Sequence, residues 1–209
     1  MTYYLILFIG ILAQLFFSAR LLVQWIASEK AHKVLAPTLY WELSMAGAIL
    51  LCLYGWLRND FSIILGQFIT YYIYIWNIDA KGLWKKLSKM VRGVVIMIPL
   101  LAFGYVILNF DDANIKLFQN KDIPVWLIIF GSIGQSIFTL RFIYQWWYSR
   151  KEGECSLPLL FWVISIIGSG LIICYAIIRQ DTVLILGQTA GFIIYARNIL
   201  IEYRYKLLK

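Results

Sequence analysis

The chain has 209 residues, of which 62% are hydrophobic, 17% are aromatic and only 14% are charged. This composition excludes an ordinary soluble domain, in which roughly a quarter of the residues are charged. Lysine and arginine number 19 against 11 acidic residues, which gives a formal charge of +8. Because the basic residues gather in the connections between long apolar runs, they indicate membrane topology and not a nucleic-acid partner.

Seven apolar segments follow one another along the chain, each close to the roughly 20 residues that a membrane-crossing helix needs. They cover residues 4–28, 38–57, 61–79, 94–110, 124–148, 159–178 and 182–201. Because lipid cannot satisfy an open backbone, we expect each of them to be a helix. The first has no basic region before it and no small-residue cleavage site after it, so we expect a retained helix and not a secretory signal. The sequence therefore predicts an all-α integral membrane protein with seven transmembrane helices.

The first three segments recur as the last three. Residues 10–78 align with residues 131–199 at a constant offset of 121, without a gap and with 25 identities. Many identities are residues that membrane helices do not carry by default. They include Gln14/Gln135, Arg20/Arg141, Gln24/Gln145, Pro37/Pro158, Trp41/Trp162, Arg58/Arg179, Asp60/Asp181, Gly66/Gly187, Gln67/Gln188 and Asn77/Asn198. A duplication of this kind predicts tandem structural repeats.

The duplication divides the chain into three parts. Residues 1–80 form the first three-helix repeat, and residues 124–209 form the second. Residues 81–123 hold a basic connector, a linker helix at 94–110 and an external loop. Three crossings alone would leave the second repeat upside down, and the unmatched linker helix restores its orientation. We therefore predict parallel repeats in a 3+1+3 plan, related by an axis along the membrane normal.

Basic residues predict the orientation. Thirteen lysines and arginines lie in the connections after the first, third and fifth spans and at the C-terminus, against four on the opposite face. The positive-inside rule makes the first face cytoplasmic. The N-terminus is then outside and the C-terminus is cytoplasmic.

A set of spaced residues resembles a known family. The pattern is Arg20-x3-Gln24-Trp25-x2-Ser28, Pro37-x3-Trp41-x2-Ser44-x2-Gly47, Arg58-x-Asp60, Gly66-Gln67 and Asn77. It is similar to the lipid A biosynthesis N-terminal domain family, and both repeats carry it. That family is found alone, duplicated, or fused to glycosyltransferases of lipid A and lipid-linked sugar synthesis. The resemblance implies a bacterial inner membrane protein with membrane lipid, an anionic lipid-linked sugar and a glycosyltransferase such as lipid-A-disaccharide synthase as partners.

The 3+1+3 plan is also similar to that of SWEET sugar transporters and the wider PQ-loop group. No proline precedes Gln24 or Gln145. The Pro-Gln pair that is typical of the wider group is therefore absent.

Two of the 19 basic residues belong to neither face, Arg20 and Arg141, and both lie deep inside their predicted spans. Arg20 lies roughly eight residues, or ~12 Å, from the cytoplasmic end of its helix. That depth is long for a side chain that snorkels to the interface. One interpretation is a structural arginine bonded to carbonyls or to Gln24. We favour an anion ligand in a cavity, because intramembrane ionisable residues mark ligand pathways by default.

The other candidate ligands lie on the same helices. Six amide side chains recur in the repeats: Gln24, Gln145, Gln67, Gln188, Asn77 and Asn198. They could bind sugar hydroxyls, or they could form hydrogen bonds between helices. For Trp41 and Trp162 we favour an interfacial anchor over a sugar-stacking surface. Glu42, whose counterpart is Val163, is expected to neutralise an intramembrane arginine. A tight turn on the predicted outer face carries an arginine and an aspartate in each repeat, Arg58 with Asp60 and Arg179 with Asp181. We expect the two residues of each turn to form a solvated ion pair that stabilises the turn.

The sequence holds no metal-ligand set, no Ser/His/Asp array and no facing pair of intramembrane carboxylates. We therefore expect no cofactor and no catalysis by the chain alone. Our first hypothesis is a flippase-like binder or transporter of an anionic lipid-linked sugar, such as a polyprenyl-phosphate sugar or a lipid A precursor. Guanidinium groups suit its phosphate, and amides suit its hydroxyls. The alternatives are a non-transporting membrane partner of a glycosyltransferase and a SWEET-like carrier of small sugars.

Overall fold

The computed structural model describes residues 3–108 and 123–207. Seven long α-helices occupy these ranges, and the described residues contain no strand. The helices are α1 (Tyr3–Ala31), α2 (Thr38–Leu57), α3 (Phe61–Ala80), α4 (Lys89–Leu108), α6 (Val125–Glu152), α7 (Leu159–Arg179) and α8 (Thr182–Leu207). A short 3-10 helix, η1 (Trp84–Lys86), precedes α4. The all-α prediction is confirmed, although residues 109 and 110 of the predicted fourth span lie outside the described residues.

Six of these helices are long and apolar enough to cross a membrane, judged by length and composition: α1, α2, α3, α6, α7 and α8. Large apolar side chains cover their outer faces, among them Leu15, Ile26, Leu140, Ile167 and Ile193. Such a continuous apolar surface is stable against lipid and not against water. The described part of the chain is therefore all-α with six candidate membrane spans, and a seventh span at α4 stays a prediction.

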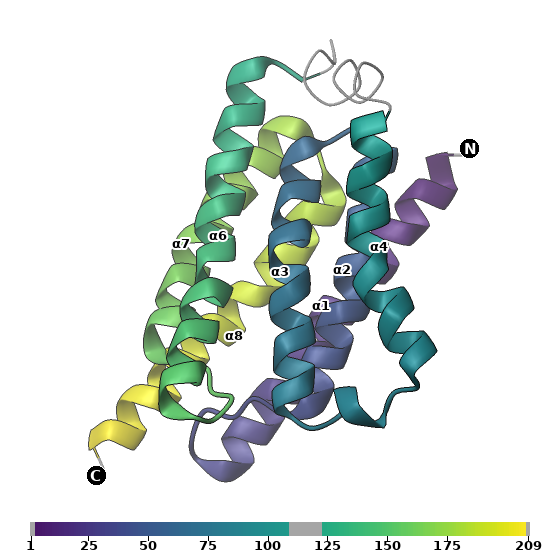
Figure 1. The fold of residues 1–209 in the computed structure, drawn as a ribbon. Helices are drawn as coiled ribbons and strands as arrows, with labels where there is room; N and C mark the ends of the chain where they lie inside the picture. The colour runs from purple at the N-terminus through teal and green to yellow at the C-terminus, as the bar shows by residue number, and fades with distance from the viewer. Residues whose placement is uncertain (1–2, 109–122, 208–209) are drawn as a thin grey trace.

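Contacts between neighbouring helices join the six spans into a closed ring, and Figure 1 shows the two halves of the chain side by side. Within each half of the chain, α1 packs on α2 and α2 on α3, while α6 packs on α7 and α7 on α8. Two seams join the halves, one between α3 and α6 and the other between α1 and α8. Helix α4 lies beside the ring, where the Tyr71 hydroxyl of α3 donates to the Val95 carbonyl of α4 at 2.9 Å. The ring places the first helix of each half against the third helix of the other half.

The turns from α2 to α3 and from α7 to α8 have the same backbone. Asn59 and Gln180 both adopt the left-handed conformation, with φ of 52° and 54°. The next residues, Asp60 and Asp181, cap the following helices by accepting hydrogen bonds from backbone N–H groups at 3.3 and 3.0 Å. A capping aspartate satisfies a helix N–H group that would otherwise lack a partner. The repeated sequence therefore forms a repeated structure at this end of the molecule, which we call the outer end.

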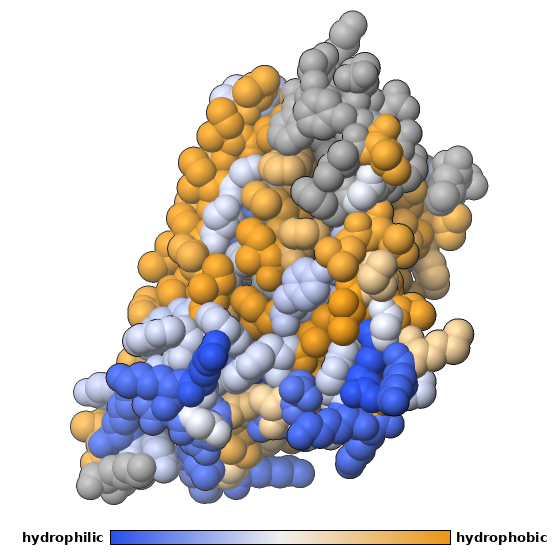
Figure 2. All heavy atoms as spheres, in the orientation of Figure 1, coloured by the Kyte–Doolittle hydropathy of each residue, from blue (hydrophilic) through white to orange (hydrophobic). Residues whose placement is uncertain are grey.

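Hydrophilic side chains gather at the opposite end, where α1 and α6 end and the C-terminus lies (Figures 1 and 2). The basic residues Lys30, Lys85, Arg150 and Lys206 belong to these helix ends and to η1. An apolar zone covers most of the remaining surface in this view (Figure 2). The side of the membrane that this basic end faces stays a prediction.

Candidate functional site

A cavity of about 40 Å³ lies inside the helix ring. Its lining comes from α1, α2, α3, α6 and α8, and most of its polar residues occur as matched pairs from the two repeats. The pairs are Gln14/Gln135, Arg20/Arg141, Gln67/Gln188 and Tyr74/Tyr195. The two intramembrane arginines, one from each repeat, therefore line one shared cavity.

Both arginines are buried, with exposed fractions of 4% for Arg20 and 2% for Arg141. The Nη1 atom of Arg20 donates to Ser44 Oγ at 2.8 Å and to the Tyr74 hydroxyl at 3.2 Å. The Nη1 atom of Arg141 donates to the Tyr195 hydroxyl at 3.4 Å. The Nε atoms of both arginines have no hydrogen-bond partner among the described residues. Each guanidinium group is thus held from one side and keeps a donor for another acceptor.

Aromatic rings surround the two cations. The guanidinium carbon of Arg141 lies 3.3 Å from the centroid of the Phe138 ring, and that of Arg20 lies 4.5 Å from the Phe17 ring. Both groups also lie over the same Phe142 ring, at 5.5 Å for Arg20 and 4.6 Å for Arg141. Cation–π contacts of this kind contribute about 0.5–2 kcal/mol each. They lower the cost of burying the cations but leave both positive charges in place.

Neither buried arginine has a carboxylate partner in the part of the chain that the structure describes. Glu42 is exposed on the surface of α2, so the expectation that it neutralises an intramembrane arginine is wrong. Position 42 lies about 200° around the helix from Ser44, which does face Arg20. Burying two cations without a counter-ion is costly. The cations lose their hydration, and the low-dielectric interior does not replace it.

Four of the six predicted amide ligands lie outside the cavity lining. Gln24 and Asn198 exchange two hydrogen bonds at 2.7 and 3.1 Å, and Gln145 and Asn77 exchange two at 3.0 and 3.1 Å. All four side chains are fully buried. They join α1 to α8 and α3 to α6, so they bond helix to helix in this structure.

Trp41 and Trp162 are fully buried, which makes the interfacial-anchor prediction wrong. Trp41 packs against Tyr74 and Phe142, with ring centroids 6.2 and 6.4 Å away, and Trp162 packs against Tyr195 at 6.0 Å. The face of α2 or α7 that carries the tryptophan turns into the ring. Neither tryptophan lines the cavity.

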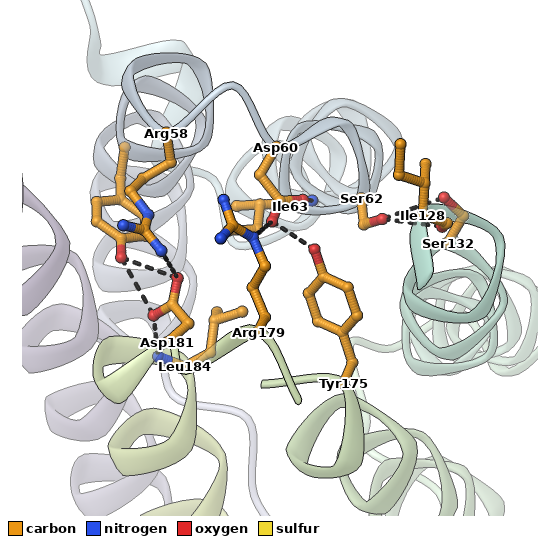
Figure 3. Close-up of polar contacts among 11 residues, drawn as sticks. Arg58, Asp60, Ser62, Ile63, Ile128, Ser132, Tyr175, Arg179, Asp181 and Leu184 are labelled. Carbon is orange, nitrogen blue, oxygen red and sulfur yellow. Dashed lines mark hydrogen bonds and ion pairs between the residues drawn. The ribbon is translucent and has the colours of Figure 1, made fainter. Parts of the chain in front are cut away.

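Two crossed polar clusters join the repeats at the outer end (Figure 3). Asp60 accepts a hydrogen bond from the Tyr175 hydroxyl at 2.5 Å and lies 4.0 Å from Arg179 Nε. Asp181 accepts hydrogen bonds from the Tyr54 hydroxyl at 3.1 and 3.0 Å and lies 3.6 Å from an Arg58 nitrogen. These pairs are Arg58–Asp181 and Arg179–Asp60, so the predicted ion pairs within each turn are wrong. A carboxylate from one repeat instead binds a tyrosine and an arginine of the other.

Burial around the first outer cluster raises the pKa of the Asp60 carboxyl. The Tyr175 hydroxyl, the Ile63 N–H group and the Arg179 guanidinium act in the opposite direction. The protein thus withdraws this carboxylate from water and supplies several donors to it, as a satisfied buried anion requires.

Gln14 and Gln135 are cavity residues that the sequence argument did not select. Each reaches across to a glycine of the other repeat. A Cβ atom at Gly66 would lie 2.0 Å from Gln135 Nε2, and one at Gly187 would lie 2.0 Å from Gln14 Oε1. Each glutamine can therefore approach this closely only because the facing residue is glycine, which has no side chain. The identity of both glutamines and both glycines in the repeat alignment is the signal that could have found them.

The sequence model of the family described as "Lipid A Biosynthesis N-terminal domain" matches residues 9–79 and, a second time, residues 130–200. The chain belongs to this family. The two matches cover more than half of its length and confirm the duplication. Together with the six apolar helices, family membership indicates a membrane protein of lipid A metabolism.

Curated relatives extend the comparison. A "Lipid-A-disaccharide synthase" of Chlamydia pneumoniae is 30% identical over 207 residues, covering 96% of this chain and 34% of that protein. The Chlamydia felis protein of the same name is 28% identical over 205 residues, covering 94% and 33%. The chain thus spans about a third of the length of these relatives. No solved structure matches it.

Proposed function

We propose that this chain binds the anionic head of a lipid-linked sugar between its two repeats and moves it across a bacterial inner membrane in the manner of a flippase. The observation that carries the proposal is the pair of buried arginines, Arg20 and Arg141, which share one cavity with no carboxylate among the described residues. An anionic ligand would supply the missing counter-charge, and guanidinium groups form charge-assisted hydrogen bonds with phosphate oxygens.

Other groups in the lining suit the sugar part of such a head. Gln188 Oε1 is a buried acceptor without a partner among the described residues, and Gln14, Gln67 and Gln135 add amide donors and acceptors. Sugar hydroxyls both donate and accept hydrogen bonds, so they match amides. The lipid tail remains in the bilayer against the apolar outer faces of the helices.

A lipid-linked sugar head requires more room than the cavity has. A volume of about 40 Å³ holds roughly three water molecules. The amide pairs and the crossed clusters both join one repeat to the other. A relative movement of the repeats that separates these contacts would enlarge the site. The structure then corresponds to a closed conformation of the proposed flippase.

The proposal includes the topology. The repeats, residues 1–80 and 124–209, are parallel, and α4 crosses between them within residues 81–123, in a 3+1+3 plan. The basic end faces the cytoplasm and the N-terminus lies outside. Supporting observations are the double family match and the hydrophilic residues at one end (Figure 2).

A second candidate function is that of a non-transporting membrane partner of a glycosyltransferase. The lipid-A-disaccharide synthases that resemble this chain are about three times as long as the matched region. In this alternative, the chain presents a lipid-linked substrate to an enzyme without moving it across the bilayer. The site would bind the lipid-linked sugar in both candidates, but the non-transporting partner would not move it across the membrane.

Translocation in proteoliposomes separates the two candidates. Purified chain is reconstituted with a fluorescent lipid-linked sugar, and an impermeant quencher reports how much label remains in the outer leaflet. We expect faster equilibration than in protein-free liposomes and loss of this gain in the Arg20→Gln/Arg141→Gln double variant. Binding without translocation would support the partner role. Failure to bind any lipid-linked sugar would contradict both candidates.

A further inference from the structure

We propose that Arg20 and Arg141 together bind one group that carries two negative charges, a phosphate monoester or a diphosphate, and discriminate against a singly charged phosphodiester. This inference deepens the proposed function and rests on it for the lipid attached to the group. It narrows the ligand from any anionic lipid-linked sugar to one charge class.

The charge count in the cavity points to this class. Among the residues that the structure describes, the lining contains two guanidinium groups and no acidic residue. Every acidic residue in the described ranges is engaged or exposed elsewhere: Asp60 and Asp181 in the crossed clusters, Glu29 and Glu202 in ion pairs, and Glu42, Asp79, Glu152 and Glu154 at the surface. One negative charge would leave a buried cation uncompensated, whereas two charges would neutralise the site.

The placement of the two guanidinium groups favours one shared ligand over two separate ones. Both lie over the Phe142 ring, from opposite repeats. Both bind protein hydroxyls through Nη1 and leave Nε without a partner among the described residues. The small cavity that both of them line has space for one compact anion. Two planar forks that line one site suit a phosphate with several charged oxygens.

Four probes test the charge class at pH 8, where a phosphate monoester carries close to two charges because its second pKa is about 6. Two are lipids with the same tail, one ending in a phosphate monoester and the other in its methyl diester. Two are soluble ions, inorganic phosphate and dimethyl phosphate. Binding to the purified full chain in detergent is measured by calorimetry, with the melting temperature recorded on the same preparations.

We expect the monoester lipid to bind at least about tenfold tighter than the methyl diester, the scale of one charge-assisted hydrogen bond. In Arg20→Gln, which removes one positive charge, the affinity for the monoester lipid should exceed that for the methyl diester lipid by about twofold or less. The ratio in the unmodified protein is decisive even where a variant does not fold. Inorganic phosphate should show the same preference over dimethyl phosphate, with lower affinity than the lipid.

The outcomes separate this inference from the proposed function. Equal affinity for both lipids overturns the two-charge inference and leaves lipid binding intact. Tight binding of inorganic phosphate, without binding of either lipid, supports a site for two charges and contradicts the lipid-linked ligand. Absence of binding for all four probes contradicts both.

Discussion

Gln24 and Asn198 lie near opposite ends of the chain and hold each other through two reciprocal hydrogen bonds, at 2.7 and 3.1 Å. The equivalent residues of the other seam, Gln145 and Asn77, form the same pair. A buried amide pair of this kind satisfies polar groups that would otherwise be costly to bury. The two pairs therefore stabilise the helix ring beside the arginine cavity.

Gln24→Leu should destabilise the folded protein by about 1–3 kcal/mol, because it leaves the buried Asn198 amide without its main partner. Thermal unfolding in detergent measures the loss. The double variant Gln24→Leu/Asn198→Leu is the matched control, since replacing both partners by apolar groups can be nearly neutral. A single variant as stable as the parent protein would show that the pair contributes nothing.

Tyr175→Phe should also destabilise the protein by about 1–3 kcal/mol, because the buried Asp60 carboxylate loses a hydrogen-bond donor at the outer end. Tyr54→Phe should behave similarly in the second crossed cluster. Tyr203→Phe is the control, since Tyr203 is 59% exposed. Melting temperatures that change equally in all three variants would contradict a specific role for the crossed clusters.

Gly66→Ala should weaken ligand binding with little loss of stability. The new Cβ atom would collide with the Gln135 side chain and displace it within the cavity, while alanine favours the helix by up to about 1 kcal/mol. Gly170→Ala provides the control, because nothing lies within 4 Å of its added Cβ atom. If both variants bind the lipid as tightly as the parent, Gln135 does not contribute to the site.

Cysteine substitutions at Lys85, Asp111 and Lys206 test the topology. We expect an impermeant thiol reagent on intact cells to label position 111 and not positions 85 or 206. The native cysteines are replaced first, so that only the introduced thiols can be labelled. Of the native ones, Cys155 should react slowly in any case, because burial raises the pKa of its thiol to about 11 and keeps it protonated at neutral pH. Labelling at 85 without labelling at 111 would invert the proposed orientation.

The fold followed from the sequence to a large extent. The apolar segments predicted the helices because a membrane-crossing helix has a narrow range of lengths. The repeat alignment selected residues that meet in space, such as Arg20 and Arg141 in one cavity. It also matched Asp60 with Asp181, which cap equivalent helices.

The errors concerned contacts between helices that are distant in the chain. Gln24 and Arg20 are four residues apart and therefore share a face of α1, but this spacing does not show that Gln24 meets Asn198 while Arg20 meets the cavity. Trp41 lies near the start of its helix, a position that favours an interfacial anchor, although the rotation of α2 buries it. Glu42 is the next residue, and the same rotation turns it to the surface, away from Arg20. Depth along a helix can be counted from sequence, whereas rotation toward a neighbour depends on packing.

The central claim is that Arg20 and Arg141 are anion ligands and not structural arginines. The direct measurement is lipid binding by Arg20→Gln and Arg141→Gln, together with yield and melting temperature on the same preparations, and with the exposed Glu42→Gln as the control. We predict that each arginine variant stays folded and binds a phosphorylated lipid-linked sugar more weakly by about 1.5–3 kcal/mol, the scale of a charge-assisted hydrogen bond. Loss of folded protein, with unchanged lipid affinity in the fraction that survives, would contradict the claim.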